Sequence, residues 1–116
     1  MKVIIDLIQS IREEINDQGD FTLLAMLLKE SESGEMRLIG EKPISRAQII
    51  DNQLIFYVDM KERLVQVEPL LRVLNNLKND EMMMSVKVSV SEQFFDIIGF
   101  GKSEKDKKFV VFIESH

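Results

Sequence analysis

Residues 82–113 constrain the fold more than any other part of the chain, because three runs in this segment are typical of adjacent antiparallel strands. Over residues 82–91 the even positions are apolar, and the odd positions from Ser85 onward are polar. This period of two is the signature of a strand with one buried and one solvated face. Residues 94–102 form a second β-prone run, and residues 109–113 form a third that is apolar on both faces. A polar connector of hairpin length separates the last two runs.

A repeat of isoleucines predicts a helix near the N-terminus, over residues 3–16. The repeat consists of Ile4, Ile8, Ile11 and Ile15. This spacing places the four side chains on one face of a helix. Gly19 follows the repeat and can adopt the left-handed conformation that commonly ends a helix. We expect Ile8 and Ile11 to face the core.

A second helix is predicted in the middle of the chain, over residues 60–79, where leucine and valine continue a helical stripe. Asp59 and Glu62 have the spacing of a capping box at its start. Pro69 leaves two interpretations open. Either it kinks a single helix, or residues 64–67 form a strand and a shorter helix begins with Pro69 at its first position. The kinked helix is the preferred interpretation.

The apolar runs in the first half of the chain predict further strands. Residues 21–28 are almost entirely apolar and suit a buried central strand, and residues 36–39 return as its partner after a polar turn. Residues 40–43 contain glycine and proline and are expected to break that ladder. An extended pattern resumes over residues 44–58, in which residues 51–53 are either a turn or a bulge.

These elements predict an α+β fold: a largely antiparallel sheet of five to six strands with an N-terminal helix and a second central helix. At 116 residues, without a repeat or a linker, the chain is expected to form a single domain over residues 1–116. The chain has no cysteine, which fits a reducing compartment. The apolar run at the N-terminus is too short for a signal peptide or a membrane span, so we expect a cytoplasmic protein that does not enter a membrane.

The net charge of −5 is unevenly distributed along the chain. Residues 1–35 hold eight acidic and three basic side chains, which gives −5, whereas residues 36–116 hold twelve of each. No concentrated basic patch of the kind that binds nucleic acid is visible. The expected partner is therefore a basic protein that docks on the acidic N-terminal third. The candidate contact residues are Glu13 and Asp17 on the first helix, and Glu30, Glu32 and Glu35 on the first hairpin.

The sequence offers little catalytic chemistry. Gly101, Lys102 and Ser103 match the end of a phosphate-binding loop, but Asp96 stands where that motif requires glycine, and a charged connector follows in place of a helix. The only histidine is His116, at the last position, where an oriented base is not expected. The glutamates of the first hairpin lack the spacing of a calcium loop. We therefore expect no catalytic residue, no cofactor and no metal.

A run of three methionines at residues 82–84 is expected to fill the core or a dimer interface. Copper binding is the other interpretation, but neighbouring residues on a strand alternate between its faces and do not converge on one ion.

The order of helix, strands, helix and strands in an acidic chain of this size is similar to that of class I secretion chaperones and some toxin-immunity proteins, in composition and topology. We therefore expect a non-enzymatic protein-binding module with an inhibitory, immunity or chaperone-like role. One alternative is a structural homo-oligomer, because residues 21–28 and 109–113 are apolar on both faces and two helices on one side cannot cover them. The other alternative is a small enzyme that uses carboxylates.

Overall fold

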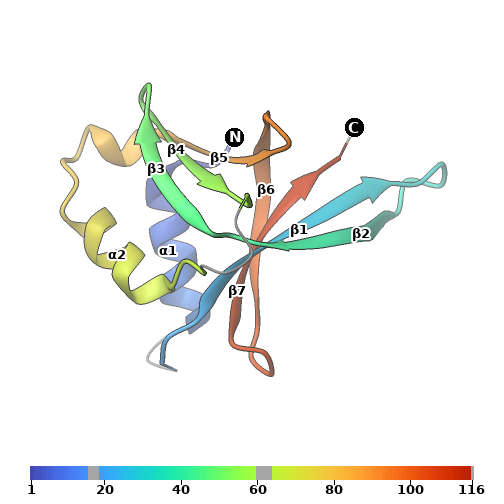
Figure 1. The fold of residues 1–116 in the computed structure, drawn as a ribbon, viewed down its shortest axis with the longest axis horizontal. Helices are drawn as coiled ribbons and strands as arrows, with labels where there is room; N and C mark the ends of the chain where they lie inside the picture. Colours follow the sequence, from blue (N-terminus) through green and yellow to red (C-terminus); the bar gives the residue numbers. More distant parts are fainter. Residues whose placement is uncertain (16–18, 60–63, 116) are drawn as a thin grey trace.

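Two helices and one sheet make up the part of the chain that the computed structural model describes, which is residues 1–15, 19–59 and 64–115 (Figure 1). The elements, in chain order, are α1 (Ile4–Ile15), β1 (Thr22–Glu30), β2 (Met36–Pro43), β3 (Arg46–Ile50), β4 (Gln53–Tyr57), α2 (Val67–Asn75), a 3₁₀ turn η1 (Glu81–Met83), β5 (Ser85–Val90), β6 (Gln93–Ser103) and β7 (Lys108–Glu114). The fold is α+β, as the sequence predicts. His116 lies outside the described residues.

The sheet has seven strands in the order β2-β1-β7-β6-β5-β4-β3. The β1–β7 and β4–β5 pairs are parallel, and the other neighbouring strands are antiparallel. The prediction of a largely antiparallel sheet of five to six strands was therefore wrong in strand number, and the sheet is mixed. The long connection that contains α2 allows β4 and β5 to be parallel neighbours, because such neighbours need a long crossover. The sequence predicts a helix between these two strands, but short-range patterns do not show that the strands on either side of it are neighbours in the sheet.

The three C-terminal strands confirm the antiparallel unit that the sequence predicts. β6 lies between β5 and β7 and is antiparallel to both. Val86 and Val88 of β5 are fully buried, so the apolar positions of its alternating pattern do face the core. The strand begins at Ser85 and not at residue 82, because the methionines enter η1 first. Of these methionines, Met82 and Met84 pack against the core, and Met83 is exposed.

Two residues, Ile44 and Ser45, join β2 at one edge of the sheet to β3 at the other edge. The sheet therefore curls until its edges meet at this link. The Ile44 N–H donates to the carbonyl oxygen of Leu23 on β1 at 3.1 Å, and the Ser45 N–H donates to that of Tyr57 on β4 at 2.8 Å. The prediction that residues 40–43 break the ladder was wrong. β2 continues to Pro43, since an edge strand tolerates proline, whose missing N–H would otherwise leave a gap in the ladder.

The β3–β4 connection is a tight turn, which decides between the turn and the bulge that the sequence left open. Asp51 and Asn52 have φ values of 52° and 61°. Two consecutive residues with positive φ make the hairpin turn whose twist matches that of the flanking strands, and aspartate and asparagine tolerate this conformation.

α2 is shorter than the preferred prediction, which was wrong over residues 64–66 and over residues 76–79. The first of these differences has a clear cause. The backbone there is extended: the Val65 N–H donates to the carbonyl oxygen of Ile44, and the Leu23 N–H donates to that of Val65. Pro69 does not kink the helix but lies in its first turn, where an N–H would have no partner within the helix. The alternative of a shorter helix is therefore closer, although α2 begins two residues before Pro69. Glu62 lies outside the described residues, and Asp59 binds elsewhere, as described below.

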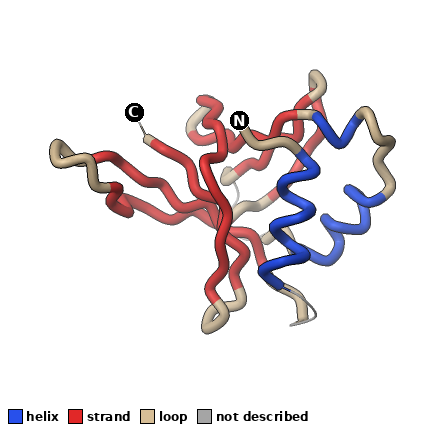
Figure 2. The backbone as a smooth tube through the Cα atoms, turned by 180° about the vertical axis from the view of Figure 1, so that it is seen from behind, coloured by secondary structure: helices blue, strands red, loops and turns tan. Residues whose placement is uncertain are grey.

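The helices and the inward side chains of the sheet form one buried cluster, which defines an inner face of the sheet. Figure 2 shows both helices on one side of the molecule. The predicted isoleucine face is confirmed, with Ile8 and Ile11 at most 2 % exposed. Phe109, Val111 and Ile113 of β7 also belong to this cluster. The residues that alternate with them point to the opposite side, which we call the outer face.

Candidate functional site

The sequence predicts five acidic residues as partner contacts, and the structure places the four that it describes on two separate surfaces. Glu13 is exposed on α1, and Glu30, Glu32 and Glu35 are exposed at the end of the β1–β2 hairpin. α1 lies beside α2, whereas the hairpin extends to the other end of the molecule (Figure 1). Asp17 lies outside the described residues. Glu13 and the hairpin glutamates therefore belong to two different surfaces.

The hairpin also carries charges that offset its glutamates. Lys29 on β1 is the cross-strand partner of Arg37 on β2. Residues 29–37 thus hold three acidic and two basic side chains, which gives a net charge of −1. Pairing with β2 brings Arg37, which lies outside the acidic first third of the sequence, alongside that segment.

The outer face of β2, β1, β7 and β6 exposes a band of apolar side chains. Leu28 lies opposite Leu38, and Met26 lies beside Phe112, so apolar side chains continue from strand to strand. We call this band the outer apolar strip, and it consists of Met26, Leu28, Met36, Leu38, Ile98 and Phe112. Leu38 is 51 % exposed and Ile98 is 44 % exposed. The two-sided apolar character of β1 and β7 therefore produces a surface that neither helix covers.

Carboxylates lie among these apolar side chains on the outer face. Glu41 is opposite Met26, and Glu114 is beside Leu28. The strand faces place Glu30 and Asp96 on the same side, so the four strands present four carboxylates there. The one lysine on this face of the four strands, Lys108, donates to the hydroxyl oxygen of Thr22 at 2.9 Å. The outer face is therefore apolar and acidic together.

Sequence reasoning missed Glu41, Asp96 and Glu114 as surface candidates because all three lie outside the acidic first third. Their common face depends on the strand register, which local composition does not show. The sequence did contain one signal that these residues share a face. Phe94, Asp96 and Ile98 alternate with the apolar residues Phe95 and Ile97, so they are expected on the opposite side of the strand.

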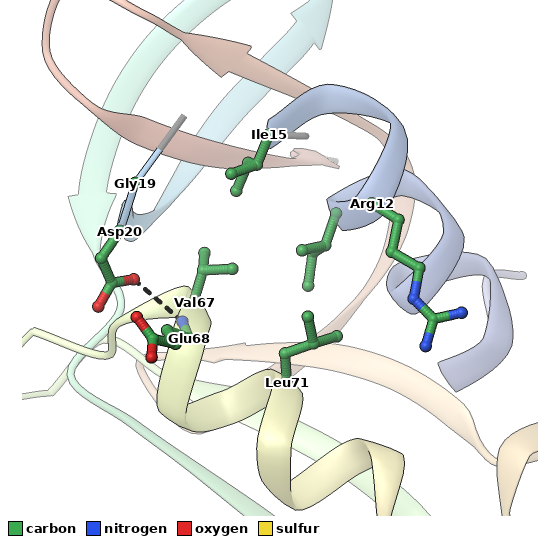
Figure 3. Close-up of a pocket in the computed structure, with 8 residues that line it drawn as sticks. Arg12, Ile15, Gly19, Asp20, Val67, Glu68 and Leu71 are labelled. Carbon is green, nitrogen blue, oxygen red and sulfur yellow. Dashed lines mark hydrogen bonds between the residues drawn. The ribbon is translucent and has the colours of Figure 1, made fainter. Parts of the chain in front are cut away.

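A hollow of about 460 Å³ lies between the end of α1 and the start of α2 (Figure 3). Ile11, Ile15, Val67 and Leu71 form its apolar walls. The charged groups at its rim have structural partners. An oxygen of the Asp20 carboxylate accepts hydrogen bonds from the backbone N–H groups of Phe21, at 2.9 Å, and Glu68, at 3.0 Å.

Gln66, at the N-cap position of α2, makes no side-chain hydrogen bond. Asp20, from a distant part of the chain, takes over this capping role through its hydrogen bond from the Glu68 N–H. The Arg12 guanidinium donates to the side-chain oxygen of Asn75 at 3.1 Å, and Glu68 pairs with Arg72 one turn along the helix. The hydrogen bond from Arg12 to Asn75 joins the two helices, so we interpret this hollow as part of their packing.

A polar cluster surrounds the point where β2 passes into β3. The Asp59 carboxylate binds the guanidinium of Arg46 at 3.0 Å and the buried hydroxyl of Ser45 at 3.0 Å. Arg46 also lies over the ring of Tyr57, 3.9 Å from its centre. The hydrogen bond from Arg46 lowers the pKa of Asp59 below its ordinary value. Asp59 therefore ties β3 to the end of β4, and its predicted role in a capping box was wrong.

The glycines near the end of β6 do not form a phosphate-binding loop, since a turn and β7 follow Ser103. The Lys102 ammonium donates to the backbone oxygen of Glu14 and pairs with Glu104 at 3.0 Å. Within the described ranges, no group of Asp, Glu, His or Cys side chains could hold a metal ion. None of the described helices is long and apolar enough to span a membrane.

Comparisons with protein-family models, with curated proteins and with solved structures found no match to this chain. The chemistry of the surfaces described above is therefore the basis for assigning a function.

Proposed function

We propose that this chain is a non-enzymatic protein-binding module that engages a basic protein partner in the cytoplasm, in an inhibitory, immunity or chaperone-like role. The observation that supports this proposal is the outer apolar strip with carboxylates among its side chains. An apolar surface left open on a sheet costs free energy in water, and such surfaces commonly serve as contact sites for other proteins.

The partner is basic because the outer face carries more carboxylates than ammonium groups. Complementary charge raises the rate of encounter and selects among partners, while the apolar strip supplies the affinity. Glu30 connects the outer face with the end of the hairpin, since its side chain lies on the outer face and its neighbours Glu32 and Glu35 lie in the hairpin. The hairpin is thus the favoured one of the two predicted acidic contacts. The other predicted contact involves Glu13, which lies on α1, and Asp17, which is outside the described residues.

The partner contacts the face of the sheet and does not extend its edge. β2 is an edge strand, but its ladder with β1 is irregular between Leu27 and Leu28, where Ile39 is the extra residue. A bulge, the charge of Lys42 and the missing N–H of Pro43 all disfavour the addition of another strand.

The test is to capture the partner with tagged variants of the protein in a lysate of its native host. In the double variant Leu38→Ser and Ile98→Ser, two exposed side chains of the strip lose their apolar surface. Val73→Ser is the matched control, because Val73 is 59 % exposed on α2. We expect a stoichiometric basic protein with the wild type and the control and its loss with the double variant.

Circular dichroism must show that the double variant is folded. Retention of the partner by the folded double variant would contradict the proposed surface, and a bound metabolite without any protein would favour an enzyme.

A structural homo-oligomer is the second candidate function, and the same strip favours it. Two copies could cover each other's apolar side chains around a twofold axis. The carboxylates on this face oppose that arrangement, because self-contact brings like charges together. The basic partner is therefore the preferred proposal.

A further inference from the structure

A hollow of about 600 Å³ lies on the outer face, where β6 passes the end of β7. Its lining residues are Gln93, Phe94, Phe95, Asp96, Ile98 and Glu114. The irregular register of β6 beside Ile98 displaces this side chain from the regular ladder. The hollow adjoins the outer apolar strip, of which Ile98 is a member.

The walls of this hollow are apolar, and its charged groups are carboxylates. Phe94 is 57 % exposed and Ile98 is 44 % exposed, so both offer apolar surface to the hollow. Asp96 has one cationic neighbour, the Lys87 ammonium at 3.7 Å, a distance longer than a hydrogen bond. Within the described residues, no hydrogen bond or ion pair engages the Glu114 carboxylate. The hollow therefore combines an exposed aromatic ring, an aliphatic wall and one carboxylate without a partner.

We propose that this hollow binds the side chain of an arginine or lysine of the basic partner, an inference that rests on the proposed function. The aliphatic stem of such a residue packs on Ile98, and its cationic end reaches Glu114 and Asp96. The ring of Phe94 adds an attractive face for the cation. A basic side chain with an aliphatic stem therefore uses the apolar wall and the carboxylates at once.

The hollow also sets the pattern of the partner segment. A basic side chain in the hollow places its neighbours over the outer apolar strip, toward Phe112. The partner segment therefore has a cationic residue next to apolar ones. This charge complementarity distinguishes a basic partner from a second copy of the chain, which would bring its own carboxylates to the same place.

The experiment is an NMR titration of the isotope-labelled protein with a short acetylated peptide that alternates leucine and arginine. A twin peptide carries citrulline, which has nearly the same shape without the charge. We expect the arginine peptide to shift the backbone signals of residues 94–98 and Glu114, and the citrulline peptide to bind about three- to tenfold more weakly. Glu114→Gln should weaken binding of the arginine peptide by a similar factor.

Glu13→Gln is the matched control, since it makes the same chemical change at an exposed glutamate on α1. It should leave the affinity for the arginine peptide unchanged. Three results would each overturn the proposal. The two peptides could bind with equal affinity, or Glu114→Gln and Glu13→Gln could lower the affinity for the arginine peptide equally. The third result is that the signals of residues 94–98 do not shift. If the hollow fails this test while the double variant at Leu38 and Ile98 still loses a basic partner, the proposed function stands without the hollow.

Discussion

The ring of Phe112 on β7 lies against Gly101 on β6, so closely that a Cβ atom at Gly101 would stand 3.1 Å from its Cε2 atom. The glycine therefore leaves the space that this aromatic ring occupies on the outer face. Phe112 is a central member of the outer apolar strip, so the shape of the strip depends on the absence of a side chain at Gly101.

Gly101→Ala is expected to displace the Phe112 ring and to lower the free energy of unfolding by about 1 kcal/mol, because extra atoms in a packed space cost roughly this much. Gly99→Ala is the matched control. A Cβ there would lie 3.8 Å from Phe112, an ordinary contact, so this variant should be neutral or slightly stabilising. Urea unfolding measures both, and equal stabilities would mean that the Phe112 ring moves aside without cost.

Ile11→Ala and Val88→Ala are each expected to lower the free energy of unfolding by about 2–4 kcal/mol. Both side chains are almost completely buried in the common core, at 2 % and 0 % exposure, so truncation leaves a cavity. Ile49→Ala, at a side chain that is 40 % exposed on β3, should cost less than either. Denaturant unfolding of the three variants tests this order, and a cost at Ile49 as large as at Val88 would contradict the assigned strand faces.

Asp59→Asn is expected to lower stability at neutral pH and to have little effect in acid. The hydrogen bond from Arg46 lowers the pKa of Asp59 in the folded state. The stability that follows from this shift is present above the unfolded pKa of about 4, and it is lost as the pH falls through the lowered folded pKa. Urea unfolding of wild type and variant between pH 7 and pH 2 measures the difference, and a difference independent of pH would rule out ionisation of Asp59 as its source.

Reversal of Glu30, Glu32 and Glu35 to Lys is expected to slow association with the basic partner and to flatten its salt dependence, while the fold stays intact. Exposed charges act mainly on encounter rate and only modestly on affinity. Stopped-flow association at low and high salt measures both effects. Glu13→Lys, on the separate surface of α1, serves for comparison. Unchanged rates for the hairpin variant at low salt would remove the hairpin from the proposed contact.

Weak self-association of the isolated protein is expected at micromolar concentration when no partner is present, because the outer apolar strip has no cover in a single chain and exposed carboxylates only weaken such a contact. Multi-angle light scattering should give a mass that rises with protein concentration. The double variant of Leu38 and Ile98 to Ser should remain monomeric. A strictly monomeric wild type would show that the carboxylates of this face are enough to keep two copies apart.

Local patterns in the sequence determined the elements that depend on neighbouring residues. The isoleucine repeat predicted α1 and its buried face, and the alternation around Val86 and Val88 predicted β5 and its orientation. The two-sided apolar runs in β1 and β7 predicted a surface that two helices cannot cover. These inferences were possible because periodicity and burial are coupled within a single helix or strand.

Only the tertiary structure decided the order of the strands and the curl of the sheet at Ile44. It also decided which side chains from different strands lie together on each face of the sheet. The parallel β1–β7 pair brings Glu114 beside Leu28, and the antiparallel β1–β2 pair brings Arg37 beside Lys29. Both residues thereby join surfaces to which their position in the sequence does not assign them. Within the acidic first third of the chain, Glu13 lies on α1, whereas Glu30, Glu32 and Glu35 lie on the hairpin at the other end of the molecule. Charge along a sequence is one-dimensional, whereas the field at a surface depends on which strands lie side by side and on the register that turns each side chain inward or outward.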